Sequence, residues 1–248
     1  MKKICVFDVD GIIIDSTDEC LIIAWNAYQA YIGANSYIKD VNDADNEYDE
    51  KFRATRNYVR SMGEYLVVFE CEYSALLSQD DYEAKLLTLD QGNIQLFAKC
   101  FFDQRNKLKK NDYAFWLSLH RIYDGVPEIL HTCNNQGNLY VVTGKDKESV
   151  IDIFNYMGIN INPNKVFDKN AADNKLESLK RIATIENVDN GLINFIDDNV
   201  THLRAPQLSG FSIALGDWGY ALPEHIKMAH EYNMLVIPIT KVIDFMLR

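Results

Sequence analysis

The stretch "VFDVDGIIIDS", Val6 to Ser16, decides the fold, because its apolar run ends in two carboxylates, Asp8 and Asp10. Side chains two apart in a strand point to the same face, so both acids should lie at the carboxyl end of a strand over residues 4–9. In open α/β sheets ligands bind at that end. Two neighbouring carboxylates repel each other unless a cation or a shared proton offsets their charge. The pair is therefore either a polar turn or part of a site for a hard cation such as Mg²⁺.

The composition is that of an ordinary globular protein, with 248 residues, 48% hydrophobic and 25% charged. The formal net charge of -11 disfavours a nucleic-acid partner, because phosphate backbones are bound by clustered Lys and Arg. The cysteines are odd in number and lack metal-site or redox-motif spacing, so neither a zinc site nor a disulfide framework is predicted. Asp8 interrupts the first apolar run, and no apolar stretch reaches bilayer length. We therefore expect a cytoplasmic protein with no membrane partner.

Short apolar runs predict buried strands, and helical patterns alternate with the later ones. One such helix should begin after Asn174, whose side chain is a good N-cap. Strands alternating with helices predict a mainly parallel sheet covered on both faces, which is a Rossmann-like three-layer α/β/α core. The predicted strands lie at residues 4–9, 139–142, 165–167, 192–196, 211–215 and 234–237.

Residues 17–123 break this alternation and contain long amphipathic patterns. They predict an α-helical cap domain inserted into a catalytic core made of residues 1–16 and 124–248. Within the insert, residues 66–69 could instead form a strand, and the acidic stretch 39–52 should be a solvated loop between helices. The helical patterns cover residues 19–33, 66–77, 93–108 and 113–123.

A second acidic pair, Asp197 and Asp198, follows the predicted strand at residues 192–196. If that strand lies beside the first one in a parallel sheet, four carboxylates meet at one edge. Such crowding is costly without a cation and forms a metal site with one. The second pair therefore favours a metal site over a polar turn.

Groups suited to holding an anion complete the pattern. Thr143 and Gly144 end the strand at residues 139–142 and offer a hydroxyl and accessible backbone N–H groups for phosphoryl oxygens. Lys175 opens a helical pattern before the second acidic pair and could offset negative charge. Lys169 is an alternative for that role.

These ordered motifs resemble the haloacid dehalogenase-like superfamily, mainly its phosphoglycolate phosphatase and β-phosphoglucomutase-like branch with a helical cap. The matching motifs are "DVDG" at 8–11, "VVTG" at 141–144, Lys175 and "IDD" at 196–198. The resemblance spans almost the whole core. Two positions depart from the family pattern: Ile12 replaces a usual Thr, and His202 stands where another acid is common.

The resemblance implies a phosphoric monoester hydrolase. Asp8 would attack phosphorus to form an aspartyl-phosphate, while Asp10 would act as general acid and then general base. Mg²⁺ would be held by the Asp8 carboxylate, the Asp10 backbone carbonyl and Asp198, with Asp197 as a second acidic member. The phosphoryl oxygens would be held by Thr143, the Gly144 region and Lys175.

The motifs also select among the family's reactions. Halide removal and phosphonate cleavage do not use an acid at the Asp10 position, so both are disfavoured. A phosphosugar mutase of the same fold stays open, and so does a non-catalytic protein that binds a phosphorylated ligand, although a binder needs neither Asp8 nor Asp10. The expected partner is a small phosphorylated metabolite, and the expected assembly is a monomer or homodimer.

Two arginines in the insert are candidates for substrate binding. Arg56 and Arg60 are four residues apart and would share one helix face, from which they could reach a substrate carboxylate or second phosphate. The alternative is that they are exposed and pair with nearby acids such as Glu47, Glu50 or Glu64.

Overall fold

The computed structural model describes residues 3–76, 78–172 and 174–247. The chain divides into two compact units, one made of Met1–Asp15 and Arg121–Arg248 and the other of Ser16–His120. The sequence placed these boundaries after residue 16 and before residue 124. The assignment of the two units as catalytic core and cap stays a prediction.

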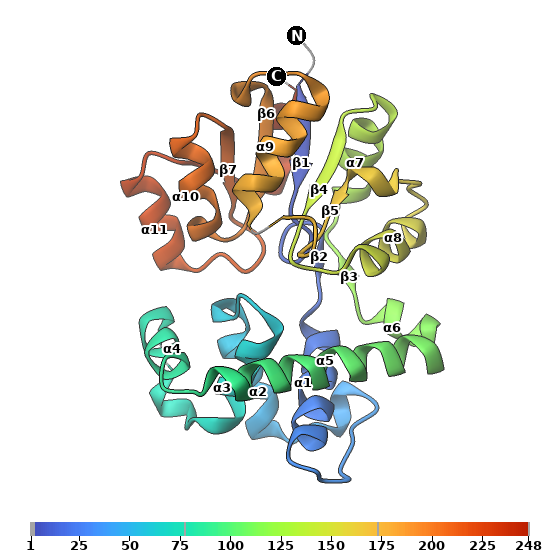
Figure 1. The fold of residues 1–248 in the computed structure, drawn as a ribbon, viewed down its shortest axis with the longest axis vertical. Coiled ribbons are helices and arrows are strands. Elements are labelled where there is room, and N and C mark those ends of the chain that lie inside the picture. The colour runs from blue at the N-terminus through green and yellow to red at the C-terminus, as the bar shows by residue number, and fades with distance from the viewer. Residues whose placement is uncertain (1–2, 77, 173, 248) are drawn as a thin grey trace. The chain divides into compact units, whose positions relative to one another are not determined.

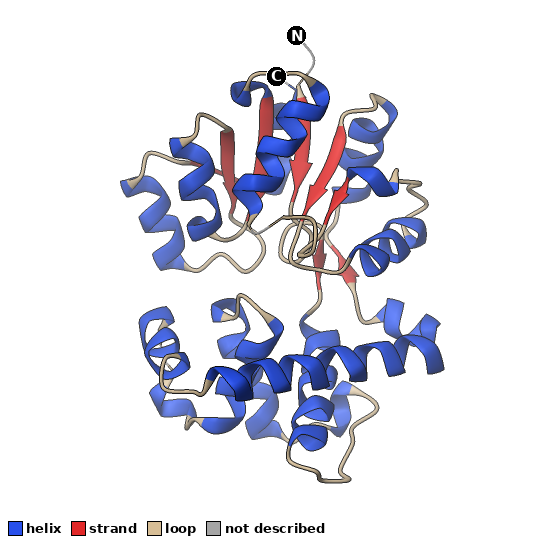
Figure 2. Ribbon diagram, in the orientation of Figure 1, coloured by secondary structure: helices blue, strands red, loops and turns tan. Residues whose placement is uncertain are grey.

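A six-stranded sheet forms the centre of the first unit, and every neighbouring pair of strands in it is parallel (Figures 1 and 2). The spatial order is β5-β4-β1-β6-β7-β8, so the first strand lies between the second and fourth strands of this sheet along the chain. This confirms the predicted mainly parallel sheet. The strands are β1 (Ile4–Phe7), β4 (Leu139–Val142), β5 (Val166–Phe167), β6 (Ile193–Asp197), β7 (Ser212–Gly216) and β8 (Leu235–Ile237).

Helices cover both faces of this sheet. Successive residues of a buried strand point to opposite faces, so each face carries apolar side chains that a helix can cover. On one face Val6 belongs to a buried cluster with Leu179 and Leu203. On the other face the Cys5 thiol donates a 3.5 Å hydrogen bond to the Met246 carbonyl oxygen. This arrangement confirms the predicted three-layer α/β/α fold class. The helices of this unit are α7 (Val126–Asn135), α8 (Lys147–Tyr156), α9 (Lys175–Glu186), α10 (Val200–Leu208), α11 (Pro223–Glu231) and α12 (Val242–Leu247).

A second, two-stranded sheet lies at the junctions where the chain leaves and re-enters this unit. Strand β2 (Ile14–Asp15) pairs antiparallel with β3 (Arg121–Ile122), and an ion pair of 3.1 Å joins Asp15 to Arg121. The helix predicted over residues 113–123 therefore ends early. Helix α6 spans Tyr113–Ser118, and the residues that follow satisfy their backbone groups against β2 instead of continuing the helix.

The second unit is helical, as predicted for the insert, and its described residues contain no strand. The loop predicted at residues 39–52 is wrong in its second half, because α2 starts at Asn46 with the Asp45 side chain accepting from the Tyr48 backbone N–H. The helix predicted at residues 66–77 is also interrupted after Glu70, and Leu77 lies outside the described residues. The helices are α1 (Thr17–Tyr31), α2 (Asn46–Thr55), α3 (Leu66–Glu70), α4 (Gln79–Leu86), α5 (Gln91–Asn111) and α6.

A buried ion pair links α1 to α5 inside the second unit. Arg105 donates to both carboxylate oxygens of Glu19, at 2.6 and 2.8 Å, and Trp116 donates a third bond of 3.3 Å. The side chains of Glu19 and Arg105 are 0% and 1% exposed. Burying two charges is costly, and each is tolerated here because the other neutralises it.

We predict that Arg105→Ala lowers the free energy of unfolding by about 3–5 kcal/mol, because it leaves the Glu19 carboxylate buried without its counter-charge. Urea unfolding followed by circular dichroism measures the change. The matched control is Arg53→Ala, which removes exposed ion pairs to Asp18 and Asp49 and should cost about 0–1 kcal/mol. Similar losses in both variants would contradict a structural role for the buried pair.

Candidate active site

Three neighbouring strands deliver polar residues to the same edge of the sheet. Because β4, β1 and β6 are adjacent and parallel, their carboxyl ends lie side by side. Thr143 follows β4, Asp8 follows β1, and Asp197 is the last residue of β6. Backbone hydrogen bonds continue past the strand ends, since the Asp8 N–H donates to Ile196 and the Thr143 N–H donates to Phe167, both at 3.0 Å. The backbone hydrogen bonds of the sheet therefore fix the positions from which these side chains project.

Lys175 joins the ends of β1 and β6. Its Nζ lies 2.7 Å from Asp8 Oδ2 and 2.6 Å from Asp197 Oδ2. The lysine is the first residue of α9, whose N-cap Asn174 accepts from the Glu177 backbone N–H, as the sequence predicted. One ammonium group thus separates two buried carboxylates.

The pKa values of these three groups move in different directions. Burial raises the pKa of Asp8 most, with Lys175 opposing it and the Asp197 charge adding to it. For Lys175, burial acts to lower the pKa, but the two carboxylates outweigh it and raise the pKa. The pKa of Asp197 falls below its usual range because Lys175 and His202 together outweigh the opposing effect of burial. Asp197 is therefore the firmly ionised partner, and Asp8 is the more basic of the two carboxylates.

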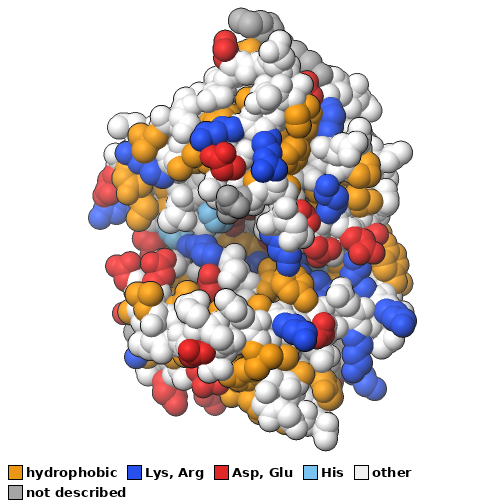
Figure 3. Space-filling view, viewed as in Figure 1, with side chains coloured by type: hydrophobic (Ala, Val, Ile, Leu, Met, Phe, Trp, Pro, Cys, Tyr) orange, Lys and Arg blue, Asp and Glu red, His pale blue; other side chains and the backbone are white. Residues whose placement is uncertain are grey.

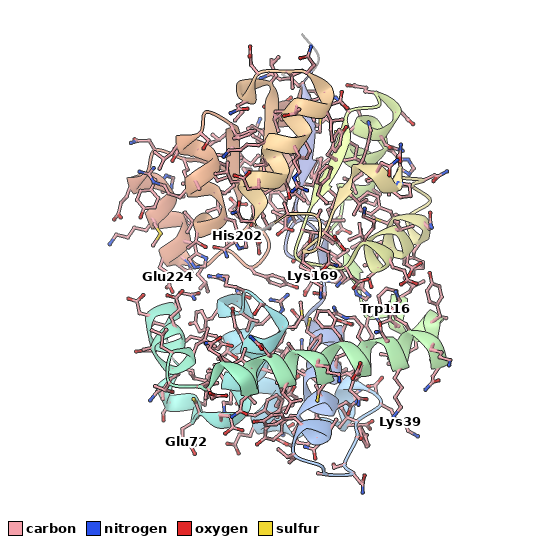
Figure 4. All side chains as sticks on the ribbon, in the orientation of Figure 1. Lys39, Glu72, Trp116, Lys169, His202 and Glu224 are labelled. Carbon is pink, nitrogen blue, oxygen red and sulfur yellow. The ribbon has the colours of Figure 1, made fainter. Side chains whose placement is uncertain are left out.

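His202, on α10, also contacts the Asp197 carboxylate. Its Nδ1 is 3.3 Å from the Asp197 carboxylate, which also accepts a 2.9 Å bond from the Asn199 N–H. The His202 side chain remains 33% exposed, and Figure 4 labels it beside the helices that follow β6. The position that departs from the family pattern thus contacts Asp197, the residue that Lys175 also holds.

Asp198 is fixed by close backbone packing. Its Oδ2 accepts a 3.1 Å bond from the Tyr220 backbone N–H. A Cβ on Gly11, where φ is +84°, would lie 2.1 Å from the same oxygen, and a Cβ on Gly219 would lie 1.7 Å from the Gly11 carbonyl oxygen. Only glycine fits at both positions, because the two loops and the Asp198 carboxylate are in direct contact.

Asp10 and Asp8 contact different lysines. Its Oδ1 lies 3.3 Å from Nζ of Lys145, whose side chain is 0% exposed. Lys145 had no predicted role, although the sequence contains a usable signal: Lys145 follows Thr143 by two residues at a strand end, the same spacing that relates Asp10 to Asp8. Its backbone N–H donates to Thr143 Oγ1 at 3.2 Å.

Two other predicted residues of the first unit, Gly144 and Lys169, are more exposed than Asp8, Lys175 and Asp197. Gly144 is exposed, and apart from its two chain neighbours no described residue has an atom within 4 Å of the position its Cβ would take. Lys169, the alternative to Lys175, is exposed on the loop after β5 (Figure 4). Lys175, in contrast, contacts Asp8 directly at 2.7 Å.

The predicted shared helix face of Arg56 and Arg60 is wrong. Helix α2 ends at Thr55, Arg56 begins a single 3₁₀ turn, and the backbone is extended at Val59 before Arg60. Arg60 donates to the Gln79 side chain at 2.7 Å. Arg56 is 6% exposed and lies 5.8 Å from the centre of the Tyr65 ring, so the alternative of an exposed arginine does not hold for it. A role of either residue in substrate binding stays a prediction.

The donor set suits a divalent cation. Asp8, Asp197 and His202 each offer a ligand atom, and these atoms lie within 4.8 Å of one another. Four carboxylates and two ammonium groups at the strand ends leave two negative charges in excess. A bound divalent ion would balance that excess, and carboxylate oxygens are the ligands that Mg²⁺ prefers. The carboxylates are Asp8, Asp10, Asp197 and Asp198.

The chain matches the family model of the haloacid dehalogenase-like hydrolases over residues 2–210. That match covers most of the sequence, so the chain belongs to this family of hydrolases, and the resemblance seen in the motifs is confirmed.

Solved structures share the fold over both units. A predicted phosphoglycolate phosphatase from Haemophilus somnus aligns with TM-score 0.64 and 16% identity, covering 98% of this chain and 97% of its own. A predicted phosphatase from Clostridium acetobutylicum aligns with TM-score 0.63 and 13% identity, covering 98% of each chain. A haloacid dehalogenase-like protein from Streptococcus pneumoniae gives TM-score 0.59 and 13% identity, over 96% and 94%. No curated protein matches the sequence.

Lys and Arg side chains are interspersed with Asp and Glu on the face shown in Figure 3. Among the described residues, no helix has both the length and the apolar character that a membrane crossing requires. The cytoplasmic location stays a prediction.

We predict that Gly219→Ala lowers the free energy of unfolding by about 1–3 kcal/mol, because its Cβ would collide with the Gly11 carbonyl and force the loop apart. Urea unfolding measures the change. The matched control is Gly191→Ala, whose Cβ would meet its nearest atom at an ordinary 3.8 Å. Equal unfolding midpoints for the two variants would contradict the close packing described for this loop.

Proposed function

We propose that this chain is a Mg²⁺-dependent phosphatase that hydrolyses a small phosphorylated metabolite through an aspartyl-phosphate on Asp8. The observation that carries the proposal is the pairing of two acids with two separate lysines: Asp8 contacts Lys175, and Asp10 contacts Lys145. Two carboxylates in different electrostatic surroundings can take different parts in one reaction. Family membership supports hydrolysis as the class of reaction.

The first half-reaction uses Asp8 as nucleophile. Its carboxylate oxygen attacks phosphorus, the bond from phosphorus to the leaving oxygen breaks, and Asp10 gives its proton to that oxygen. In the second half, Asp10 takes a proton from water, the water oxygen attacks phosphorus, and the bond to Asp8 breaks. Inorganic phosphate is released, and both aspartates return to their starting protonation states.

The phosphoryl oxygens need donors, and three are available at the strand ends. Lys175 supplies a charged donor beside Asp8. The Thr143 hydroxyl already accepts from the Lys145 backbone N–H, so its own proton is available to a phosphoryl oxygen. Backbone N–H groups around the exposed Gly144 add further donors. Such preorganised donors stabilise the charge that spreads over these oxygens in the transition state.

The metal would be held by the Asp8 carboxylate, the Asp10 backbone carbonyl and Asp198, with Asp197 as the second acidic member. When bound, it supplies positive charge that offsets the carboxylates and the phosphate. The excess of two negative charges among the four carboxylates and two lysines at the strand ends supports this assignment. Since the similar Haemophilus somnus protein is a predicted phosphoglycolate phosphatase, we propose phosphoglycolate as the first metabolite to assay.

We predict that Asp8→Asn lowers Mg²⁺-dependent phosphate release by at least about 10³-fold, because an amide preserves the shape but is a poor nucleophile. Release from an aryl phosphate and from phosphoglycolate is measured with a phosphate assay. The control is Asp189→Asn, an exposed acid in the same unit, which should keep the parental rate. A near-parental rate in Asp8→Asn would rule out Asp8 as nucleophile.

We predict that removing divalent ions with a chelator abolishes turnover and that adding Mg²⁺ restores it. A second readout does not depend on activity: Mg²⁺ should raise the thermal unfolding temperature of the parent and should raise that of Asp198→Asn less, because a ligand stabilises the folded state in proportion to its binding. Full turnover after chelation, with no Mg²⁺-induced shift in unfolding, would overturn the metal assignment.

A further inference from the structure

Lys145 is a buried lysine whose ammonium group contacts the Asp10 carboxylate. Its side chain is 0% exposed, and its Nζ lies 3.3 Å from Asp10 Oδ1. Among the described residues, Asp10 is the one carboxylate within ion-pair distance of Lys145. A lysine is expensive to bury unless a counter-charge compensates it. The pair therefore fixes where the ammonium lies, and the ammonium in turn restricts the Asp10 carboxylate.

The backbone on both sides of this pair is held in place. Lys145 lies between the end of β4 and the start of α8: its N–H donates to Thr143, and the next residue, Asp146, caps α8 by accepting from the Ser149 N–H at 2.9 Å. On the other side, Asp10 forms an isolated bridge with Ile14. Two fixed segments of backbone thus present one acid to one lysine.

We infer that Lys145 is the positioning residue of Asp10, holding its carboxyl group in the orientation needed to give a proton to the leaving oxygen. The inference rests on the proposed phosphatase function and extends it. In the protonated acid Oδ1 still accepts from Lys145 as the carbonyl oxygen, and we place the transferred proton on Oδ2. In the step itself, the Oδ2–H bond breaks as the leaving oxygen gains that proton and its bond to phosphorus is lost.

The two lysines at the strand ends then have separate tasks. Lys175 contacts Asp8 and Asp197 and acts on the nucleophile and the phosphoryl group. Lys145 contacts Asp10 and acts on proton transfer. The alternative is that Lys145 binds the phosphoryl group as Lys175 does. The two roles differ in one measurable respect, because only proton donation depends on how good the leaving group is.

The test compares phenyl phosphate with 4-nitrophenyl phosphate, two substrates of similar size. Nitrophenolate departs without a proton, whereas phenolate is a poorer leaving group and benefits from one. The ratio kcat/KM covers the steps up to departure of the leaving group. We expect Lys145→Met to lower kcat/KM for phenyl phosphate at least about tenfold more than for 4-nitrophenyl phosphate, within the range of general acid catalysis.

Three further variants sharpen the comparison. Asp10→Asn should show the same selective loss on phenyl phosphate, and Asp10→Asn combined with Lys145→Met should lose little more than Asp10→Asn alone, because the two residues act as one unit. Lys145→Arg, which keeps the charge, should recover part of the phenyl phosphate rate. The control is Lys180→Met on the exposed part of α9, which should leave both rates unchanged.

Each outcome decides one question. Equal losses on both substrates, or additive losses in the double variant, overturn the positioning role and assign Lys145 to phosphate binding or to the fold. Circular dichroism and thermal melting show whether Lys145→Met is folded, and Lys145→Gln replaces it in the same comparison if it is not. If the parent hydrolyses neither ester with Mg²⁺, the proposed function fails, and this inference fails with it.

Discussion

The ion pairs of Lys175 are the interaction on which the candidate site depends. Strands β1 and β6 are neighbours, so their polar ends bring Asp8 and Asp197 together whether or not their charges are compatible. One ammonium group, 2.7 and 2.6 Å from the two carboxylates, makes that proximity tolerable. Because Lys175 is the first residue of α9, the start of one helix sets the electrostatics of two strand ends. A shift of that helix by one residue would move the ammonium away from both acids.

Close backbone contact provides a second constraint, and it acts on geometry instead of charge. The loop at Gly219 lies against the Gly11 carbonyl, and Gly11 lies against the Asp198 carboxylate. Charge repulsion alone would let Asp198 move outward toward solvent. The glycine contacts and the bond from the Tyr220 N–H hold it at the strand end instead. The family's usual Thr after Gly11 is Ile12 here, and the backbone contacts around Gly11 do not involve that side chain.

The sequence predicted the sheet and the order of its motifs, because buried strands appear as short apolar runs whose ends can be located within a residue or two. It did not predict which cation meets which acid. A lysine ammonium lies at the end of a flexible four-carbon chain, so Lys145 and Lys175 could each have reached either aspartate. Helix ends were also missed where local capping decided them, as at Asp45, which starts α2. Arg56 and Arg60 were assigned to one face because the end of α2 has no strong sequence signal such as Gly or Pro.

The division of tasks among the strand ends has a consequence for specificity. In the proposed reaction, the end of β1 supplies the nucleophile and the acid, the end of β4 supplies Thr143 and Lys145, and the end of β6 supplies the acidic pair. All of these groups act on the phosphoryl unit, the metal or a single proton, which every phosphate monoester presents in the same form. These groups accelerate the reaction, but they discriminate little among the organic parts of different substrates. Selection of the metabolite must therefore come from side chains outside the strand ends.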